Sequence, residues 1–199
     1  MESSPLLLFD LGGVLIENST FESLGRLLPQ PMDPAAMRDK WLHSSAVRRF
    51  EQGEAEPAEF ARAFVAEWGL QLSPEELLRE HYRWPSGPYP GALDTVRALK
   101  RRHRVACLSN CSPPHWAKFK GFTDEFDLSL SSHLIGAIKP DEEAFLRAFR
   151  ACAVEPSEVC FFDDTPVNVE TARRMGARAF QVDGMAPLLR TLRAEGFLT

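Results

Sequence analysis

The sequence lacks the signs of a membrane or secreted protein. No apolar run approaches the roughly 20 residues needed to cross a bilayer, and no basic stretch precedes the short run at 5–9. Cysteine is scarce and shows no Cys-x-x-Cys metal spacing. We expect the four thiols to be reduced core residues of a cytoplasmic protein. They are Cys107, Cys111, Cys152 and Cys160.

An excess of positive charge is also absent. The chain of 199 residues has a formal net charge of −5. A negative surface repels phosphates, which argues against nucleic acid or an anionic membrane as a partner. A small phosphorylated substrate stays compatible with this charge, because it needs only a local positive site.

What is present is an alternation of strands and helices. Continuous apolar runs occur at 5–9, 104–108, 159–162 and 178–182, with a weaker one at 127–131. Such runs are typical of strands buried on both faces. Apolar stripes of helical period separate them, within 91–102, 141–152, 166–175 and 185–196. We therefore predict an α/β fold, a Rossmann-like parallel sheet with helices on both faces.

Residues 17–84 differ, because they read as helical throughout and show no strand signal. An apolar face runs from Phe60 to Trp68, and the capping box Ser73–Glu76 opens the next helix. Arg48 and Arg49 are expected on a solvated helix face. We predict that residues 1–16 and 86–199 form the core domain and residues 17–85 a small all-helical cap inserted after the first strand.

Polar residues of matching chemistry stand where the expected strands end. Asp10 follows the first strand, Ser109 and Asn110 the second, and Asp163 and Asp164 the third. Lys139 precedes the helix at 141. In an open α/β sheet, ligands bind beyond the carboxyl ends of the strands. These side chains are therefore expected to converge at one edge of the sheet.

The expected cluster suits phosphoryl transfer. Three neighbouring carboxylates repel one another and attract a cation, and hard oxygen ligands suit Mg²⁺. A magnesium ion would offset the repulsion between Asp10 and a phosphate and position the phosphorus for in-line attack. Asp10 could then form an aspartyl-phosphate that water hydrolyses. Ser109, backbone N–H groups and Lys139 would hold the phosphate oxygens.

The same residues resemble the four motifs of the haloacid dehalogenase-like hydrolase superfamily. The matching segments are Phe9–Leu15, Leu108–Asn110, Ile138–Asp141 and Phe161–Asp164, in the superfamily's order. The helical insert is similar to that superfamily's cap. Within it, the chain most resembles bacterial sugar-phosphate phosphatases of the α-glucose-1-phosphate phosphatase subgroup. The phosphatase domain of soluble epoxide hydrolases is a further relative.

The resemblance implies a magnesium site. It makes Asp10 both nucleophile and metal ligand, and it gives the backbone carbonyl of Gly12 to the metal. Asp164 becomes a metal ligand, and Asp163 ligates directly or through water.

The resemblance also implies a phosphate site. Ser109 and Asn110 would bind the phosphate and Lys139 would neutralise it. Asn168 stands where relatives often have an Asp that orients the lysine or the metal shell.

Gly12 departs from the superfamily's common Asp-x-Asp motif, whose second Asp protonates the leaving oxygen and activates water. General acid–base help is worth about two to four orders of magnitude. The resembling sugar phosphatases also carry Gly here, so a water, a cap residue or a good leaving group could compensate.

Three functions stay open. The first is a phosphatase acting on a small metabolite, with a sugar phosphate as the leading substrate; transfer to a sugar rather than to water is a variant of it. The second is a catalytically weak or inactive binding module. The third is a 2-haloacid dehalogenase, which needs no metal and leaves Asp163 and Asp164 without a purpose. The sequence specifies neither the oligomeric state nor the physiological substrate.

Overall fold

The N-terminal apolar run forms the central strand of a parallel sheet. The computed structural model describes residues 4–198, and its five-stranded sheet has the order β5-β4-β1-β6-β7, with every pair parallel. The strands are β1 (Leu6–Phe9), β4 (Val105–Ser109), β5 (Leu128–Ser131), β6 (Val159–Asp163) and β7 (Arg178–Gln181). The predicted α/β fold is confirmed, including the weak strand at 127–131.

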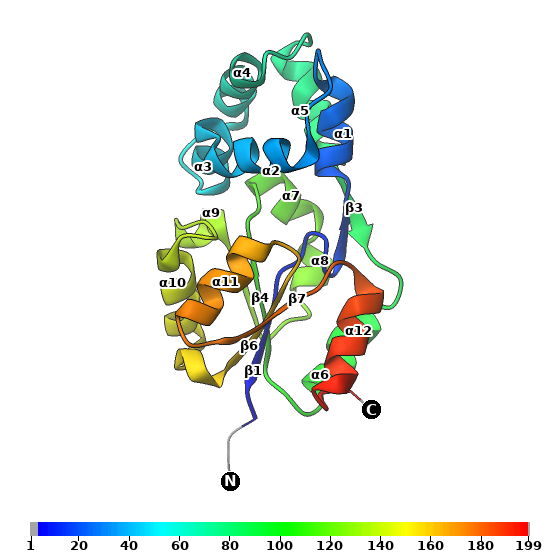
Figure 1. Cartoon of the computed structure of the whole chain (residues 1–199), viewed down its shortest axis with the longest axis vertical. Helices are drawn as coiled ribbons and strands as arrows, with labels where there is room; N and C mark the ends of the chain where they lie inside the picture. The colour runs from blue at the N-terminus through cyan, green and yellow to red at the C-terminus, as the bar shows by residue number, and fades with distance from the viewer. Residues whose placement is uncertain (1–3, 199) are drawn as a thin grey trace.

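The two faces of the sheet are buried by different helices. Because side chains of a strand alternate between faces, Leu7 and Phe9 join one core cluster while Leu6 and Leu8 join another. Helices α6 (Ala92–Lys100) and α12 (Met185–Ala194) cover the first face, and α10 (Glu142–Cys152) and α11 (Pro166–Arg174) the second (Figure 1). This double burial explains why β1 is apolar at every position rather than at every second one.

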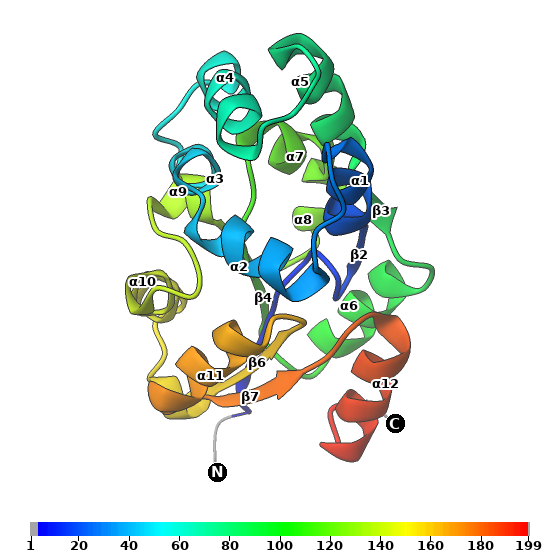
Figure 2. The same ribbon diagram turned by 45° about the horizontal axis from the view of Figure 1, so that its top comes forward.

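The helices of the insert pack around a core of their own at one end of the molecule (Figures 1 and 2). Phe64 lies at its centre and contacts the rings of Trp41, Phe60, Trp68 and Trp84. We call these helices the cap helices. They are α1 (Thr20–Leu27), α2 (Pro34–His43), α3 (Ser45–Glu51), α4 (Pro57–Trp68) and α5 (Pro74–Arg83). The predicted capping box at Ser73 and Glu76 is present.

One expectation for the insert is wrong, because its entry and exit contain strands. β2 (Ile16–Asn18) and β3 (Pro85–Pro88) form a two-stranded antiparallel ribbon, with a register shift between Glu17 and Asn18. The strands are very short, and prolines at both ends of β3 disfavour a strand in any local pattern. The predicted domain boundaries fall within β2 and at the start of β3, and they stay a prediction.

Short helices in the connecting segments also went unpredicted. They are α7 (Pro113–Lys118), α8 (Lys120–Thr123) and α9 (Ser132–Ile135). None of the helices within residues 4–198 is long and apolar enough to span a membrane.

The four cysteines are all free thiols. Cys107, Cys152 and Cys160 are buried as predicted, whereas Cys111 is only partly buried in the loop after β4. The interpretation of Cys111 as a core residue is therefore wrong: it lies in a partly exposed loop whose backbone is hydrogen-bonded to Ser132 and His133.

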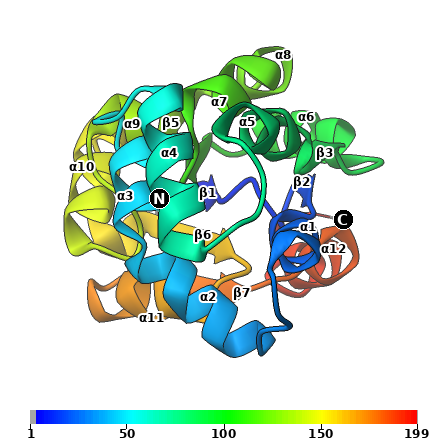
Figure 3. The ribbon, with the colours of Figure 1, turned by 90° about the horizontal axis from the view of Figure 1, so that it is seen from above.

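Cap helix α3 is anchored on the sheet domain, as seen from above in Figure 3 where α3 and α9 overlap. Arg48 forms an ion pair with Asp141, the N-cap residue of α10. Just after α3, a Cβ built on Gly53 would lie 2.9 Å from the carbonyl oxygen of His133 in α9, so the two backbones are in close contact. The expectation of a solvated face for Arg48 is wrong, because its guanidinium finds a carboxylate across the domain junction.

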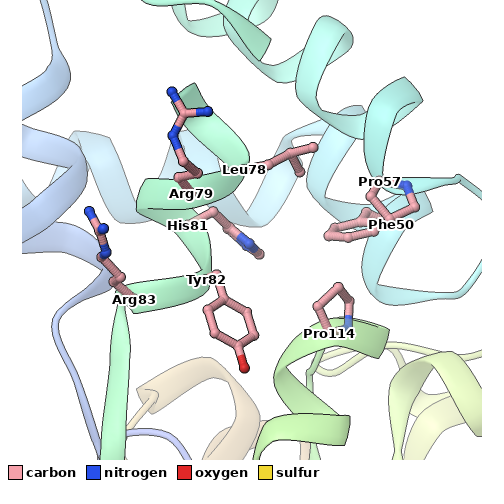
Figure 4. Close-up of a pocket in the computed structure, with 8 residues that line it drawn as sticks. All are labelled: Phe50, Pro57, Leu78, Arg79, His81, Tyr82, Arg83 and Pro114. Carbon is pink, nitrogen blue, oxygen red and sulfur yellow. The ribbon is translucent and has the colours of Figure 1, made fainter. Parts of the chain in front are cut away.

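A second junction joins α5 to α7 through two stacked imidazoles. The rings of His81 and His115 lie 4.3 Å apart, and Nε2 of His115 lies 2.8 Å from the carbonyl oxygen of His81, a hydrogen bond. His81 also lines a pocket of about 400 Å³ between the cap helices and Pro114 (Figure 4). Burial lowers the pKa of His115 to about 4, and burial together with the charge of His115 lowers the pKa of His81 well below its ordinary value.

We predict that acid weakens this junction. The pKa of His115 is lower in the folded protein than in the unfolded chain. The unfolded chain therefore binds a proton first as the pH falls, and the stability of the fold decreases between the unfolded and the folded pKa. For His115 the loss between pH 6.5 and 4 is on the order of 3 kcal/mol. Urea unfolding of His115→Gln should therefore show a smaller fall in stability between pH 7 and pH 4.5 than the wild type.

The exposed His43 supplies the matched control. His43→Gln should keep the wild-type dependence on pH. An unchanged pH dependence in His115→Gln would contradict the prediction.

Candidate active site

The carboxyl edge of the sheet brings together the three carboxylates that the sequence singles out. Asp10 follows β1, Asp163 ends β6, and Asp164 follows it. One oxygen from each of the three side chains lies within 4.8 Å of the others. The predicted convergence therefore occurs in the structure.

Lys139 lies beneath this cluster and is 2% exposed. Its Nζ donates hydrogen bonds to Asp10 Oδ1 at 2.8 Å and to Asp163 Oδ2 at 2.6 Å. Asn110 holds the lysine's backbone, since its Nδ2 donates to the Lys139 carbonyl and its Oδ1 accepts from the Lys139 N–H. The segment before α10 is thereby tied to the loop after β4.

Asp163 is completely buried and heavily hydrogen-bonded. Its Oδ1 accepts from the backbone N–H of Thr165 at 2.8 Å. Both of its oxygens also lie 3.0 Å from the Nδ2 of Asn168. Together with Lys139, these donors set the orientation of the Asp163 carboxylate.

One ammonium cannot neutralise three carboxylates, of which Asp10 and Asp163 are buried and Asp164 is partly buried. Burial raises the pKa of Asp10 to about 7, and the charges of Asp163 and Asp164 add to this while Lys139 opposes it. Burial and the charge of Asp163 raise the pKa of Asp164 to about 6. For Lys139, burial acts against the charged form, but Asp10 and Asp163 outweigh it and raise its pKa. The site favours a further cation.

The two glycines after Asp10 are constrained in different ways. Gly13 has a φ of +78°, and a Cβ there would lie 2.6 Å from Oδ2 of Asp164. A Cβ on Gly12 would lie 3.0 Å from Nδ2 of Asn18. The space where an acid–base side chain would start is therefore taken by the Asn18 amide, whose Oδ1 accepts from the backbone N–H and hydroxyl of Thr20.

The donor set fits a magnesium ion. The ligand atoms available are carboxylate oxygens, which hard cations prefer. The close approach of Gly13 to Asp164 leaves the carboxylate near the loop after β1. A divalent ion would also offset the charge that Lys139 leaves uncompensated.

Sequence reasoning placed the motif residues but missed some of their partners. Asn18 is one; it lies at the register shift of β2, and its Nδ2 lies beside Gly12. Glu51 in α3 is another, because Asp10 and Lys139 act electrostatically on its carboxyl. Neither residue is marked by a local pattern in the sequence.

A Rossmann-like sheet with a carboxylate cluster at its edge and a helical insert after its first strand defines a capped α/β hydrolase. The family model of haloacid dehalogenase-like hydrolases matches residues 5–176. The chain belongs to this family.

Similar proteins include both phosphatases and dehalogenases. The chain is 25% identical over 190 residues to a D-ribitol-5-phosphate phosphatase from Bacteroides thetaiotaomicron, covering 90% of this chain and 92% of that protein. A haloacid dehalogenase family enzyme from the same organism, in complex with magnesium and inorganic phosphate, has a TM-score of 0.69 and 23% identity over 90% of this chain and 94% of its own. The L-2-haloacid dehalogenase PA0810 has a TM-score of 0.62 and 25% identity, covering 90% and 85% of the two chains.

We predict that Gly13→Ala lowers magnesium affinity. The added methyl group would displace the Asp164 carboxylate, and displacements of this kind typically cost about 10- to 100-fold in metal affinity. Isothermal titration with MgCl₂ measures the effect. Gly121→Ala is the control, because a Cβ there meets nothing within 4 Å. Wild-type affinity in Gly13→Ala would show that Asp164 is not held by this contact.

We also predict that Lys139→Met destabilises the metal-free protein. Removing one partner of a buried ion pair costs about 3–5 kcal/mol, because the remaining charges are uncompensated. Magnesium should stabilise this variant more than it stabilises the wild type. Urea unfolding in chelator and in magnesium tests both statements.

Lys120→Met removes an exposed ion pair with Asp124 and serves as the control. It should change stability by no more than about 0.5 kcal/mol. Equal stability of the Lys139 and Lys120 variants in chelator would contradict the prediction.

Proposed function

We propose that this protein is a magnesium-dependent phosphatase that hydrolyses a small phosphorylated metabolite through an aspartyl-phosphate on Asp10. The observation that carries the proposal is the cluster of Asp10, Asp163 and Asp164 against the buried Lys139. A site with excess negative charge and oxygen donors has no use in carbon–halogen displacement, but it suits a metal ion and a phosphate.

Asp10, Asp164 and the carbonyl of Gly12 would hold the magnesium ion, which would draw electron density from the phosphate and shield it from the carboxylates. Asp163 is proposed to reach the ion through water. Its oxygens already accept hydrogen bonds from Lys139, Thr165 and Asn168, which supports a water-mediated contact over a direct one.

Ser109 and Lys139 would bind the phosphate oxygens. The hydroxyl of Ser109 stands at the end of β4 and makes no hydrogen bond to any residue in the described range 4–198, so it is available to a ligand. Asn110 is proposed to contribute less directly, because its Nδ2 and Oδ1 hold the backbone of Lys139.

The chemistry follows from these positions. An Oδ of Asp10 attacks phosphorus, and the bond to the leaving oxygen breaks. Lys139, hydrogen-bonded to the other side of the same carboxylate, keeps Asp10 oriented and offsets charge on the phosphoryl group. Water then attacks the phosphorus, breaks its bond to Asp10 and releases inorganic phosphate.

A polyol or sugar phosphate is the substrate class that we propose. The similarity to a D-ribitol-5-phosphate phosphatase over nearly the whole chain supports this class. Membership of the α-glucose-1-phosphate phosphatase subgroup stays a prediction. The dehalogenase alternative is supported by the similarity in fold only. It gives no role to Asp164, whose oxygen completes the carboxylate cluster.

The test is phosphate release from a panel of esters with magnesium or chelator. The panel holds D-ribitol 5-phosphate, glucose 1-phosphate, other sugar phosphates, nucleotides and p-nitrophenyl phosphate. We expect magnesium-dependent release that falls to background in Asp10→Asn, because the nucleophile is lost. Asp94→Asn, an exposed position in α6, should retain wild-type activity.

Two results would overturn the proposal. Magnesium binding without turnover of any ester would favour a binding module. Halide release from a 2-haloacid in chelator would favour the dehalogenase.

A further inference from the structure

A phosphatase at this site needs a proton donor that Gly12 cannot supply. A sugar alkoxide is a poor leaving group, and its departure is aided by a proton transferred in the transition state. The amide of Asn18 fills the space beside Gly12, with its Nδ2 3.0 Å from where a Cβ would stand. An amide does not titrate, so Asn18 does not replace the missing acid–base group.

Cap helix α3 ends in a carboxylate, Glu51, whose charge interacts with those of Asp10 and Lys139. Arg48 reaches from this helix to Asp141 on the sheet domain, and the backbone at Gly53 rests against the carbonyl of His133. Along the chain, Glu51 lies between these two contacts, at the end of α3. It follows Arg48 by three residues, which places both side chains on the same side of the helix.

The environment of Glu51 is that of an active-site group. Its side chain is partly buried and makes neither a hydrogen bond nor an ion pair with any residue between 4 and 198. The groups that act on its charge are Asp10 at the end of β1, Lys139 before α10 and Arg48 on its own helix. Its charge in turn acts on Cys111 in the loop after β4.

This environment favours a protonated carboxyl near neutral pH. Burial raises the pKa of Glu51 to about 8, the charge of Asp10 adds to the rise, and Lys139 and Arg48 oppose it. A carboxyl in this range can give a proton and take it back during one turnover.

We infer that Glu51 of the cap is the general acid and base of the reaction, in place of the side chain that Gly12 lacks. This inference rests on the proposed phosphatase function. In the first step Asp10 attacks phosphorus, the ester P–O bond breaks, and the leaving oxygen takes the proton of Glu51. In the second step water attacks the aspartyl-phosphate, gives a proton to the Glu51 carboxylate, and the bond between phosphorus and Asp10 breaks.

The test compares esters whose leaving groups differ in their need for a proton. In Glu51→Gln, turnover of the best alkyl ester of the panel should fall about 10²- to 10⁴-fold. p-Nitrophenolate leaves without a proton, so the first step on p-nitrophenyl phosphate should be spared while the second is slowed. Rapid mixing should then show a burst of about one p-nitrophenolate per site, followed by slow turnover.

The controls separate proton transfer from structure. Glu54→Gln makes the same change at an exposed position three residues away and should behave as the wild type. Glu51→Asp keeps the carboxyl and should recover part of the alkyl-ester activity without a burst. A merely structural role for Glu51 would slow both esters equally and give no burst.

The outcomes also separate this inference from the proposed function. An active wild type whose Glu51→Gln variant keeps full alkyl-ester turnover overturns the role of Glu51 alone. So does a loss on both esters that comes with no burst of p-nitrophenolate. A wild type that releases no phosphate from any ester overturns the phosphatase proposal, and the role of Glu51 falls with it.

Discussion

The buried ammonium of Lys139 is the interaction on which the site depends. It lies 2.8 Å from one carboxylate and 2.6 Å from another, each on a different strand end, and a third carboxylate stands beside them. Without this cation, the central strands β1 and β6 would place like charges side by side in the interior. The cost of burying such charges explains why so many neighbouring groups serve Lys139: Asn110 holds its backbone, and Asn168 and Thr165 orient its partner Asp163.

The parts of the molecule that sequence predicts best are those with local signals. β1 is recognisable because both of its faces are buried, so every residue from Leu6 to Phe9 is apolar. The acidic residues after β1 and β6 were found because they stand at strand ends, where parallel topology forces them together. Neither inference needs knowledge of which strand pairs with which.

The parts that sequence misses depend on contacts between distant segments. The ribbon of β2 and β3 joins residues some 70 positions apart and contains prolines that disfavour a strand. Asn110 follows Ser109 and is predicted to bind phosphate; its further contact, with the Lys139 backbone 29 residues away, has no local signal. Glu51 is one of several charged residues on a short helix, and periodicity does not tell which polar side chain of a helix meets another domain.

Placing the proton donor on the cap would couple substrate enclosure to chemistry. In a site with its acid–base group beside the nucleophile, the sheet domain alone holds every reacting group. If Glu51 takes this part, the site is complete only when α3 rests on α9 and Arg48 pairs with Asp141. Binding energy from a substrate that fills the cap would then be used to assemble the catalytic groups, which favours that substrate over water and smaller esters. Because Gly12 has no side chain and Asn18 fills the space beside it, proton transfer would depend on a residue of the cap. The cap helices would then determine both the rate of the reaction and the choice of substrate.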